Sequence, residues 1–179
     1  MAIYNDLFGV PERKKSINSK RKGNDNEWHL SKALTTWVGT PFGRVPSSGG
    51  LRWQGESRFI GDVVAQDETF KFPFTIETKS YNKLVLKNGK FSKLILKFWS
   101  QCLEDCKRSS KLPMLVVREN NMPSNDWYVF FKLDDLVNDC VNKKEMSLET
   151  IDGVCFWCIS MKNLSKIPYQ KFLSLIKKV

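Results

Sequence analysis

The sequence of 179 residues contains a single histidine, His29, and no apolar run reaches the roughly 18 residues that a membrane-spanning helix needs. The N-terminus also lacks the apolar segment of a signal peptide, so we expect a cytoplasmic protein with no membrane partner. Catalysis by a Ser–His–Asp or Cys–His arrangement would have to use His29. That residue lies two positions after Glu27 on a predicted helix, on a different face, so a surface histidine is the better interpretation.

Motifs for bound zinc or nucleotides are also scarce. The five cysteines are an odd number in a chain long enough to fold without disulfides, so reduced thiols are expected. Cys155 and Cys158 form a lone CxxC on a predicted strand, where alternation sends the two sulfurs to opposite faces. A zinc site with Cys102 and Cys106 is the less favoured alternative to buried apolar cysteines. No Walker or Rossmann glycine pattern is present.

Positive charge is abundant. Lys and Arg number 29 against 19 Asp and Glu, which gives a formal net charge of +10. Such an excess favours a polyanionic partner, either nucleic acid or an anionic membrane surface. We expect residues 1–22 to form a basic N-terminal arm and residues 23–179 to form one domain. A solvated tail is the simpler interpretation of the arm, and contact with phosphate groups is the alternative.

Apolar periodicity predicts an α/β fold whose core runs helix, strand, strand, strand, helix, strand. The first helix is expected to begin near Asn24 or Asp25, after Gly23 as a breaker. A second is expected from Phe91 or Ser92 to about Lys107. Strands are predicted at 42–45, 113–117, 127–131 and 154–159. Two further strands form a hairpin within 61–79, with its turn at 66–68. Further helices are predicted at 133–141 and 167–178.

The predicted hairpin brings acidic and basic side chains together. Asp62 begins its first strand, and Glu77 and Lys79 end its second. Side chains two apart in a strand point the same way, so Glu77 and Lys79 share a face, and strand pairing brings Asp62 towards them. Carboxylates at a shared site repel each other unless a cation lies between them, and oxygen ligands suit Mg²⁺. The motif alone is weak, but the apolar residues before Glu77 place the strand inside the sheet, where carboxylates tend to be paired or metal-bound.

Segments beside the hairpin carry groups that bind phosphate. Ser47 and Ser48 lie in a Ser/Gly loop that offers N–H and O–H donors, although a plain connection is an equally good interpretation. Arg52 and Arg58 flank Trp53, a combination that suits nucleic acid, although partial burial alone would explain the tryptophan. The predicted DNA-binding residues are Arg21, Lys22, Arg44, Ser47, Ser48, Arg52, Arg58 and Lys83.

Four short blocks occur in a specific order. They are Lys-Gly-Asn-Asp-Asn-Glu at 22–27, Arg-Val-Pro-Ser-Ser-Gly-Gly at 44–50, Gly-Asp-Val-Val at 61–64 and Ile-Glu-Thr-Lys at 76–79. With these blocks, the chain from about Arg21 to Val117 resembles the archaeal-type Holliday-junction resolvases, which also occur in phages and belong to the PD-(D/E)xK nuclease superfamily. The resemblance implies a restriction-endonuclease-like αβββαβ core at about residues 23–118, a mixed sheet flanked by helices, and a C-terminal elaboration at 119–179.

The resemblance also implies an activity. A relative of these resolvases would be a homodimeric, Mg²⁺-dependent endodeoxyribonuclease that acts on four-way junctions in DNA recombination and repair. If phage-encoded, it would act in the host cytoplasm. Trp28 stands where the family commonly has a basic residue, and the link at 51–60 is longer than usual, so junction specificity is less well supported than cleavage. The alternatives are a PD-(D/E)xK nuclease for repair, restriction or DNA degradation, and a non-catalytic nucleic-acid-binding module.

Roles follow from the matching positions. Asp62 and Glu77 match the metal-binding carboxylates, and Lys79 matches the active-site lysine. Glu27 matches a first-helix glutamate that assists metal or water binding, although an acid near a helix N-terminus is the default interpretation of Glu27 alone. Gln101 is similar to a glutamine on the second core helix of many superfamily members.

The expected chemistry is hydrolysis of a phosphodiester. Mg²⁺, with Mn²⁺ as a substitute, would be held by Asp62, Glu77 and the Thr78 carbonyl, with Glu27 as a further ligand of the metal or its water shell. The metal would polarise the phosphate. Lys79 would orient or deprotonate the attacking water, or neutralise the developing charge.

Overall fold

The structure is a computed structural model that describes residues 19–45, 60–136 and 146–176. The helices and strands are α1 (Ser19–Val38), β1 (Phe42–Arg44), β2 (Val63–Ala65), β3 (Phe74–Tyr81), α2 (Leu94–Ser109), β4 (Leu112–Glu119), β5 (Tyr128–Lys132), the 3₁₀ turn η2 (Leu133–Asp135), β6 (Ser147–Ile151), β7 (Val154–Ser160), α3 (Met161–Leu164) and α4 (Tyr169–Leu173). The predicted arm before Ser19 and the predicted DNA contacts Ser47, Ser48, Arg52 and Arg58 lie outside the described residues.

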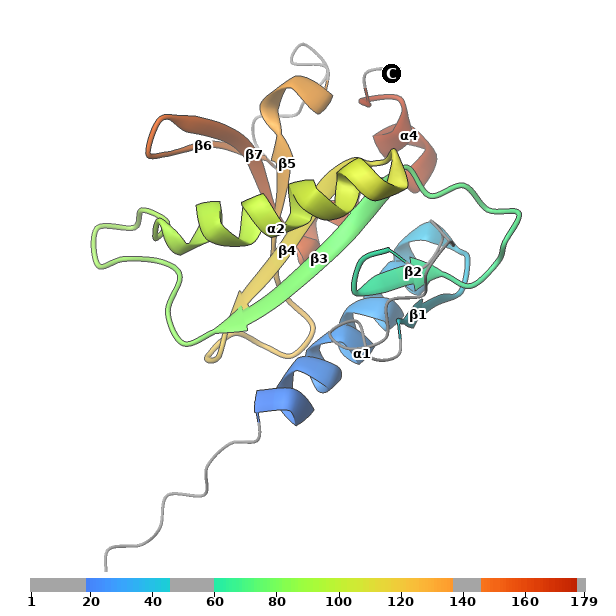
Figure 1. The fold of residues 1–179 in the computed structure, drawn as a ribbon, viewed down its shortest axis with the longest axis horizontal. Helices are drawn as coiled ribbons and strands as arrows, with labels where there is room; N and C mark the ends of the chain where they lie inside the picture. The colour runs from blue at the N-terminus through green and yellow to red at the C-terminus, as the bar shows by residue number, and fades with distance from the viewer. Residues whose placement is uncertain (1–18, 46–59, 137–145, 177–179) are drawn as a thin grey trace, which may run out of the picture.

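The strands form one mixed sheet in the order β1-β2-β3-β4-β5-β7-β6 (Figure 1). Strands β3 and β4 are parallel, with Lys79 opposite Val117, and the other neighbouring pairs are antiparallel. Helix α2 makes the crossover that a parallel pair requires. Because parallel strands end at the same edge of a sheet, the residues that follow Lys79 and Val117 meet at one edge.

Alternation along the central strands divides the core into two layers. Residues of β3 such as Ile76 share one apolar cluster with α1, and residues of β4 such as Leu115 share the other with α2. The same alternation sets the direction of the polar side chains. Thr78 lies on the α1 face of β3, whereas Glu77 and Lys79 lie on the opposite face. The candidate catalytic side chains therefore come from a strand that is covered by helices on both faces.

The α/β class and the predicted αβββαβ order are confirmed. The predicted start of the first helix is wrong, because α1 begins at Ser19 and runs through Gly23. A glycine inside a helix costs only about 1 kcal/mol relative to alanine, and the packing of the apolar face of α1 offsets that cost. Arg21 and Lys22 are consequently helical and are not part of an extended arm.

The C-terminal third differs more from the prediction. Of the helix predicted at 133–141, the described part is only the turn η2, because Leu136 pairs with Ile176 in an isolated β-bridge. The same bridge places Ile176 outside any helix, so the helix predicted at 167–178 is reduced to the five residues of α4. Strand β6 was missed, because most of its side chains are exposed and give no apolar signal. Among the described helices, none has the length and apolar character to span a membrane.

Candidate active site

The Asp62 carboxylate is held just before β2 by the backbone of β3. Its Oδ2 accepts a 2.8 Å hydrogen bond from the Thr78 N–H, and its own N–H donates to the Ile76 carbonyl at 2.8 Å. Gly61, which precedes it, has φ of +103°, and a Cβ there would lie 2.7 Å from the Ile76 carbonyl oxygen. The glycine therefore allows the chain to turn tightly against β3 and to present Asp62 to it.

Glu77 lies close enough to Asp62 for the two carboxylates to interact. The Val63–Ile76 pair and the hydrogen bond from the Asp62 N–H to the Ile76 carbonyl place Asp62 beside the part of β3 that directly precedes Glu77. Glu77 is only 1% exposed and forms an ion pair with Lys79. Burial, and then the negative charge of Asp62, raise the pKa of Glu77 to about 8. Two carboxylates and one ammonium thus share a pocket, as the sequence predicts.

Lys79 is the cation of this pocket. Burial alone lowers the pKa of its ammonium, but the carboxylates of Glu77, Asp62 and Glu27 outweigh burial and raise it. Glu27 is close enough to influence both Lys79 and Asp62 electrostatically. The first-helix glutamate predicted from the sequence therefore lies at the same site as the hairpin residues.

Arg44 fixes the position of Glu27. Its Nε donates a 2.8 Å hydrogen bond to Glu27 Oε2, and its Nη2 donates to Asn24 Oδ1 at 2.7 Å. Burial raises the pKa of Glu27, the hydrogen bond from Arg44 opposes that rise, and the charge of Asp62 adds to it. Arg44 was predicted as a DNA contact, and in the fold its guanidinium contacts Glu27 and Asn24 of α1.

A buried hydrogen-bond network behind the pocket was missed by the sequence analysis. Asn26 Nδ2 donates to Thr78 Oγ1 at 2.9 Å, and Asn26 Oδ1 accepts from Trp127 Nε1 at 2.8 Å. All three side chains are buried. Thr78 separates Glu77 from Lys79, so this network connects β3 to α1 and to the segment before β5. The only signal for Asn26 was its place one residue before Glu27.

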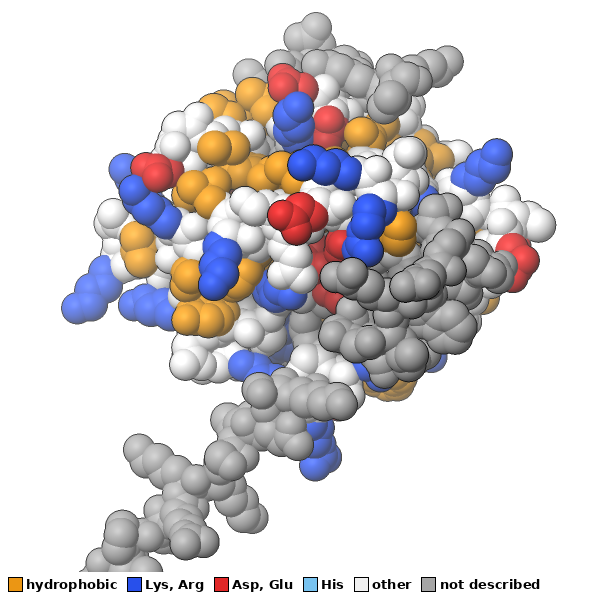
Figure 2. All heavy atoms as spheres, in the orientation of Figure 1, with side chains coloured by type: hydrophobic (Ala, Val, Ile, Leu, Met, Phe, Trp, Pro, Cys, Tyr) orange, Lys and Arg blue, Asp and Glu red, His pale blue; other side chains and the backbone are white. Residues whose placement is uncertain are grey.

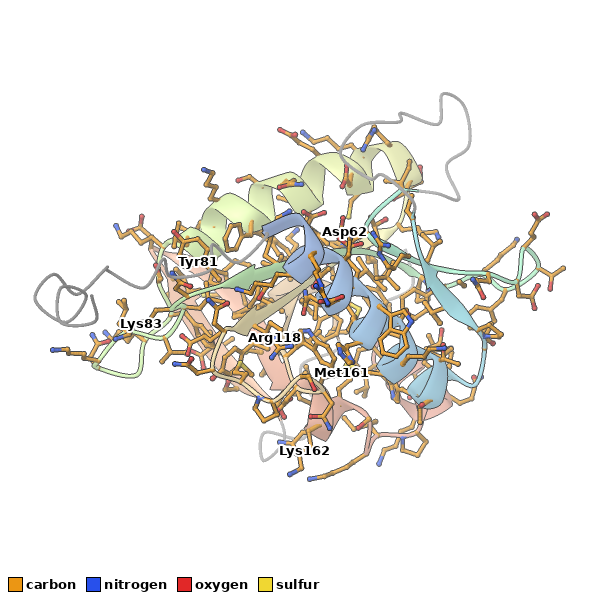
Figure 3. All side chains as sticks on the ribbon, turned by 90° about the horizontal axis from the view of Figure 1, so that it is seen from below. Asp62, Tyr81, Lys83, Arg118, Met161 and Lys162 are labelled. Carbon is orange, nitrogen blue, oxygen red and sulfur yellow. The ribbon has the colours of Figure 1, made fainter. Side chains whose placement is uncertain are left out.

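The remaining predicted residues lie nearer the surface. Gln101 is exposed on α2, whereas its neighbour Cys102 is buried with its Sγ 3.9 Å from the Thr75 carbonyl oxygen. Lys83 is exposed beyond β3, close to Tyr81 (Figure 3). Arg21 is exposed and Lys22 is half-buried on the first turns of α1. Of the predicted catalytic set, the structure brings together Glu27, Asp62, Glu77 and Lys79.

The charges of the pocket indicate whether it suits a divalent cation. Within residues 19–45, 60–136 and 146–176, no group of three or more His, Cys, Asp or Glu side chains is arranged to hold a metal. Asp62 and Glu77 nevertheless repel each other in a buried site, and a cation between them would relieve that repulsion. Mg²⁺ is commonly held by one or two carboxylates, with water and substrate phosphate supplying the other ligands. The two carboxylates therefore fit the protein's share of a magnesium site.

Basic side chains outnumber acidic ones on one face of the molecule. On the face that carries α2, Lys and Arg side chains are spread widely and acidic side chains are fewer (Figure 2). This distribution agrees with the net charge of +10. A polyanion that approaches such a surface is attracted before it reaches the acidic pocket.

One comparison with known proteins identifies a family. The family described as "phage putative PDDEXK endonuclease" matches residues 18–174. The match includes the four sequence blocks and extends through β5, β6, β7 and α4, which were predicted to be additions to a smaller core. No curated protein and no solved structure matches the chain significantly.

Proposed function

We propose, from the premise that this chain belongs to the phage PDDEXK endonuclease family, that it is a Mg²⁺-dependent nuclease that cleaves branched DNA, with four-way junctions as the preferred substrate. The observation that supports cleavage is the pairing of buried Glu77 with Lys79 beside the Asp62 carboxylate. A protein that only binds DNA has no need to hold two carboxylates where they repel phosphate. The non-catalytic alternative is therefore disfavoured.

The residues of the pocket have distinct proposed roles. Asp62 and Glu77 would hold Mg²⁺, with Glu27 at the edge of the site, and Mn²⁺ would substitute. The bound ion would supply positive charge against the phosphodiester. Lys79 Nζ, fixed by its ion pair with Glu77, would orient the attacking water and neutralise charge that develops on the phosphate.

The backbone around the pocket would keep these groups in place during the reaction. The Thr78 N–H fixes one oxygen of Asp62, and Arg44 fixes Glu27. Rigid positioning of this kind lowers the barrier, because the reacting groups need not be reordered in the transition state. A predicted ligand role for the Thr78 carbonyl remains part of the proposal.

The choice of four-way junctions and of a homodimer rests on the resemblance of the four sequence blocks to junction resolvases. Resolution of a junction requires two cuts, and a two-fold dimer matches the symmetry of the substrate. A nuclease that acts on another DNA structure in repair, restriction or degradation could use the same set of carboxylates and lysine. Substrate selectivity, rather than the chemistry, separates these possibilities.

The test compares a labelled four-way junction with a linear duplex of the same sequence, each with and without Mg²⁺. We expect symmetric nicking of the junction only with the metal, no cleavage by Glu77→Gln, and dimers by sedimentation at working concentration. Equal cutting of both DNAs would overturn junction selectivity and leave the nuclease. Full cleavage by Glu77→Gln would overturn the proposed site.

A further inference from the structure

Two basic side chains lie close together at the sheet edge where β3 and β4 end. Lys22 is on the first turns of α1, and Arg118 is near the end of β4, opposite Ser80. Burial, and then the positive charge of Arg118, lower the pKa of Lys22, so the two cations are close enough to repel each other. Figure 3 shows Arg118 on the side of the sheet where α1 lies.

Neither cation is neutralised by an acidic side chain of the described chain. Among the described residues, the ion pairs do not include Lys22 or Arg118. Lys22 Nζ donates to the neutral amide oxygen of Asn120, and Arg118 Nη2 donates to the Met122 carbonyl. The nearest acid along β4, Glu119, instead accepts hydrogen bonds from the backbone of the loop after β3.

Arg118 also has an unsatisfied donor. Its Nε is buried and has no hydrogen-bond partner in the part of the chain that the structure describes. A buried N–H without a partner costs about 1–3 kcal/mol, and more for a charged group, so such donors usually have an acceptor. The two adjacent cations without an acidic partner among the described residues, rather than this enclosed N–H, therefore indicate that an external anion completes the site.

We propose that Lys22 and Arg118 form a clamp for one backbone phosphate of the DNA strand that enters the active site. The planar guanidinium and the compact ammonium are the two side chains that bind phosphate best. This assignment rests on the proposed nuclease function, because that function makes DNA the available polyanion. The formal charge of +10 supports a polymer with many phosphates.

The clamp lies at a useful distance from the catalytic residues. Lys22 precedes Glu27 by five residues on α1, which is about 7.5 Å along the helix axis. That separation lies within the reach of a DNA strand a few nucleotides long, because each nucleotide adds about 3.4 Å of rise along the DNA axis. On the sheet, Arg118 lies opposite Ser80, whose side chain points to the α1 face, whereas the side chain of the preceding Lys79 points to the other face. Glu27 on α1 connects the two sites, because its charge acts on Lys79. A DNA strand that passes the N-terminal turns of α1 can therefore reach both the clamp and the pocket.

The test measures DNA binding separately from cleavage. Fluorescence anisotropy with a labelled duplex, in EDTA and over a range of salt concentrations, gives the affinity and the slope of log K against log[salt]. Lys22→Gln and Arg118→Gln should each weaken binding at all sequences and reduce the slope by about 0.9. Because both residues hold the same phosphate, the slope of the double variant should also fall by about 0.9 and not by twice that value.

Lys71→Gln is the matched control. It removes one positive charge from an exposed site before β3, at the opposite end of the strand from Ser80. It should leave the slope and affinity nearly unchanged, and Arg118→Lys should recover part of the affinity lost in Arg118→Gln. Thermal melting of each variant checks that the fold is retained.

Three results would overturn the clamp. The first is an unchanged salt slope in both single variants. The second is a double variant whose slope falls by about 1.8, and the third is a fall in slope and affinity in Lys71→Gln equal to that in the clamp variants. If inorganic phosphate stabilises the wild type but not Arg118→Gln, while both bind DNA equally, the site belongs to a free anion. If DNA binding depends on the clamp but the protein does not cleave DNA, the clamp stands and the nuclease proposal is wrong. If the protein cleaves DNA and neither variant changes binding or cleavage, the nuclease proposal stands and the clamp is wrong.

Discussion

The side-chain amide of Asn26 donates a 2.9 Å hydrogen bond to the Thr78 hydroxyl, although 52 positions separate the two residues. The other end of the same amide accepts a hydrogen bond from Trp127, so a single asparagine connects α1, β3 and the segment before β5. Thr78 also supplies the N–H that holds Asp62. A change at Asn26 is therefore expected to affect Asp62 through Thr78, which is hydrogen-bonded to both residues.

Replacing Asn26 tests this connection. Asn26→Ala leaves the Trp127 N–H without its acceptor in a buried site, so we expect a loss of about 1–3 kcal/mol in the free energy of unfolding. Cleavage should fall as well, because Thr78 loses its support. Urea denaturation measures the first effect and single-turnover cleavage the second. Asn125→Ala, at an exposed asparagine, is the control, and equal stability of the two variants would contradict the prediction.

Gly61 tests whether the approach of Asp62 to β3 is sterically limited. In Gly61→Ala, the new Cβ would lie 2.7 Å from the Ile76 carbonyl oxygen, at a φ of +103° that L residues rarely adopt. Gly89→Ala is a close control, because Gly89 also has a positive φ, +77°, but has nothing within 4 Å of an added Cβ. Gly89→Ala should cost roughly 1–2 kcal/mol from backbone strain.

Gly61→Ala should cost more than its control and should also lower cleavage, because β3 must shift to accept the methyl group. Thermal melting and cleavage rates measured on both variants separate backbone strain, which both share, from the close contact with Ile76, which only Gly61→Ala has. If the two variants were destabilised equally, the close contact with Ile76 would have no energetic consequence.

The parts of the site that are local in sequence were predictable. Glu77 and Lys79 share a face because alternation along a strand is fixed by backbone geometry, and Asp62 joins them through a hairpin. The contact of Trp127 with Asn26 spans 101 positions and has no local pattern, since it depends on how β5 packs beside β4. The pairing of Arg44 with Glu27 likewise depends on the register of β1 on β2.

The same distinction explains the errors in the fold. The start of α1 was misplaced because local propensity disfavours Gly23, whereas tertiary packing decides the outcome. The pairing of Arg118 with Lys22 was not predicted, because the two residues are far apart in the sequence and become neighbours only in the folded chain.

Loss of either pocket carboxylate should separate cleavage from binding. Asp62→Asn and Glu77→Gln keep the shape of the side chain but cannot ionise. Mg²⁺ would therefore lose a ligand, and at pH values where the carboxylate is ionised its repulsion of the DNA phosphate would be removed. We expect cleavage to fall by at least about 10³-fold, as for other essential groups, with DNA affinity equal to or higher than that of the wild type. Glu104→Gln removes an exposed charge from α2 and should cleave normally. Cleavage by Asp62→Asn at the wild-type rate would show that the pocket is not the active site.

The raised pKa of Glu77 predicts how stability depends on pH. The folded-state pKa is about 8, above the ordinary value of 4.5, because of burial and then the charge of Asp62. The native state therefore retains a proton that the unfolded chain releases, so this contribution to stability is complete below pH 4.5 and is lost as the pH rises through about 8. Relative to Glu77→Gln, the wild type should lose stability over that range, as measured by denaturation at fixed salt.

Mg²⁺ should reverse this loss, because the ion binds the ionised carboxylate and competes with the proton. The increase in Tm on addition of Mg²⁺ should be larger at pH 8 than at pH 6 for the wild type, since fewer protons must be displaced at the higher pH. Glu77→Gln has no proton to release at this position, so its smaller increase should be nearly independent of pH. Differential scanning fluorimetry of both proteins at the two pH values measures these shifts. An increase that is the same at pH 6 and pH 8 in the wild type would mean that Glu77 does not bind the metal.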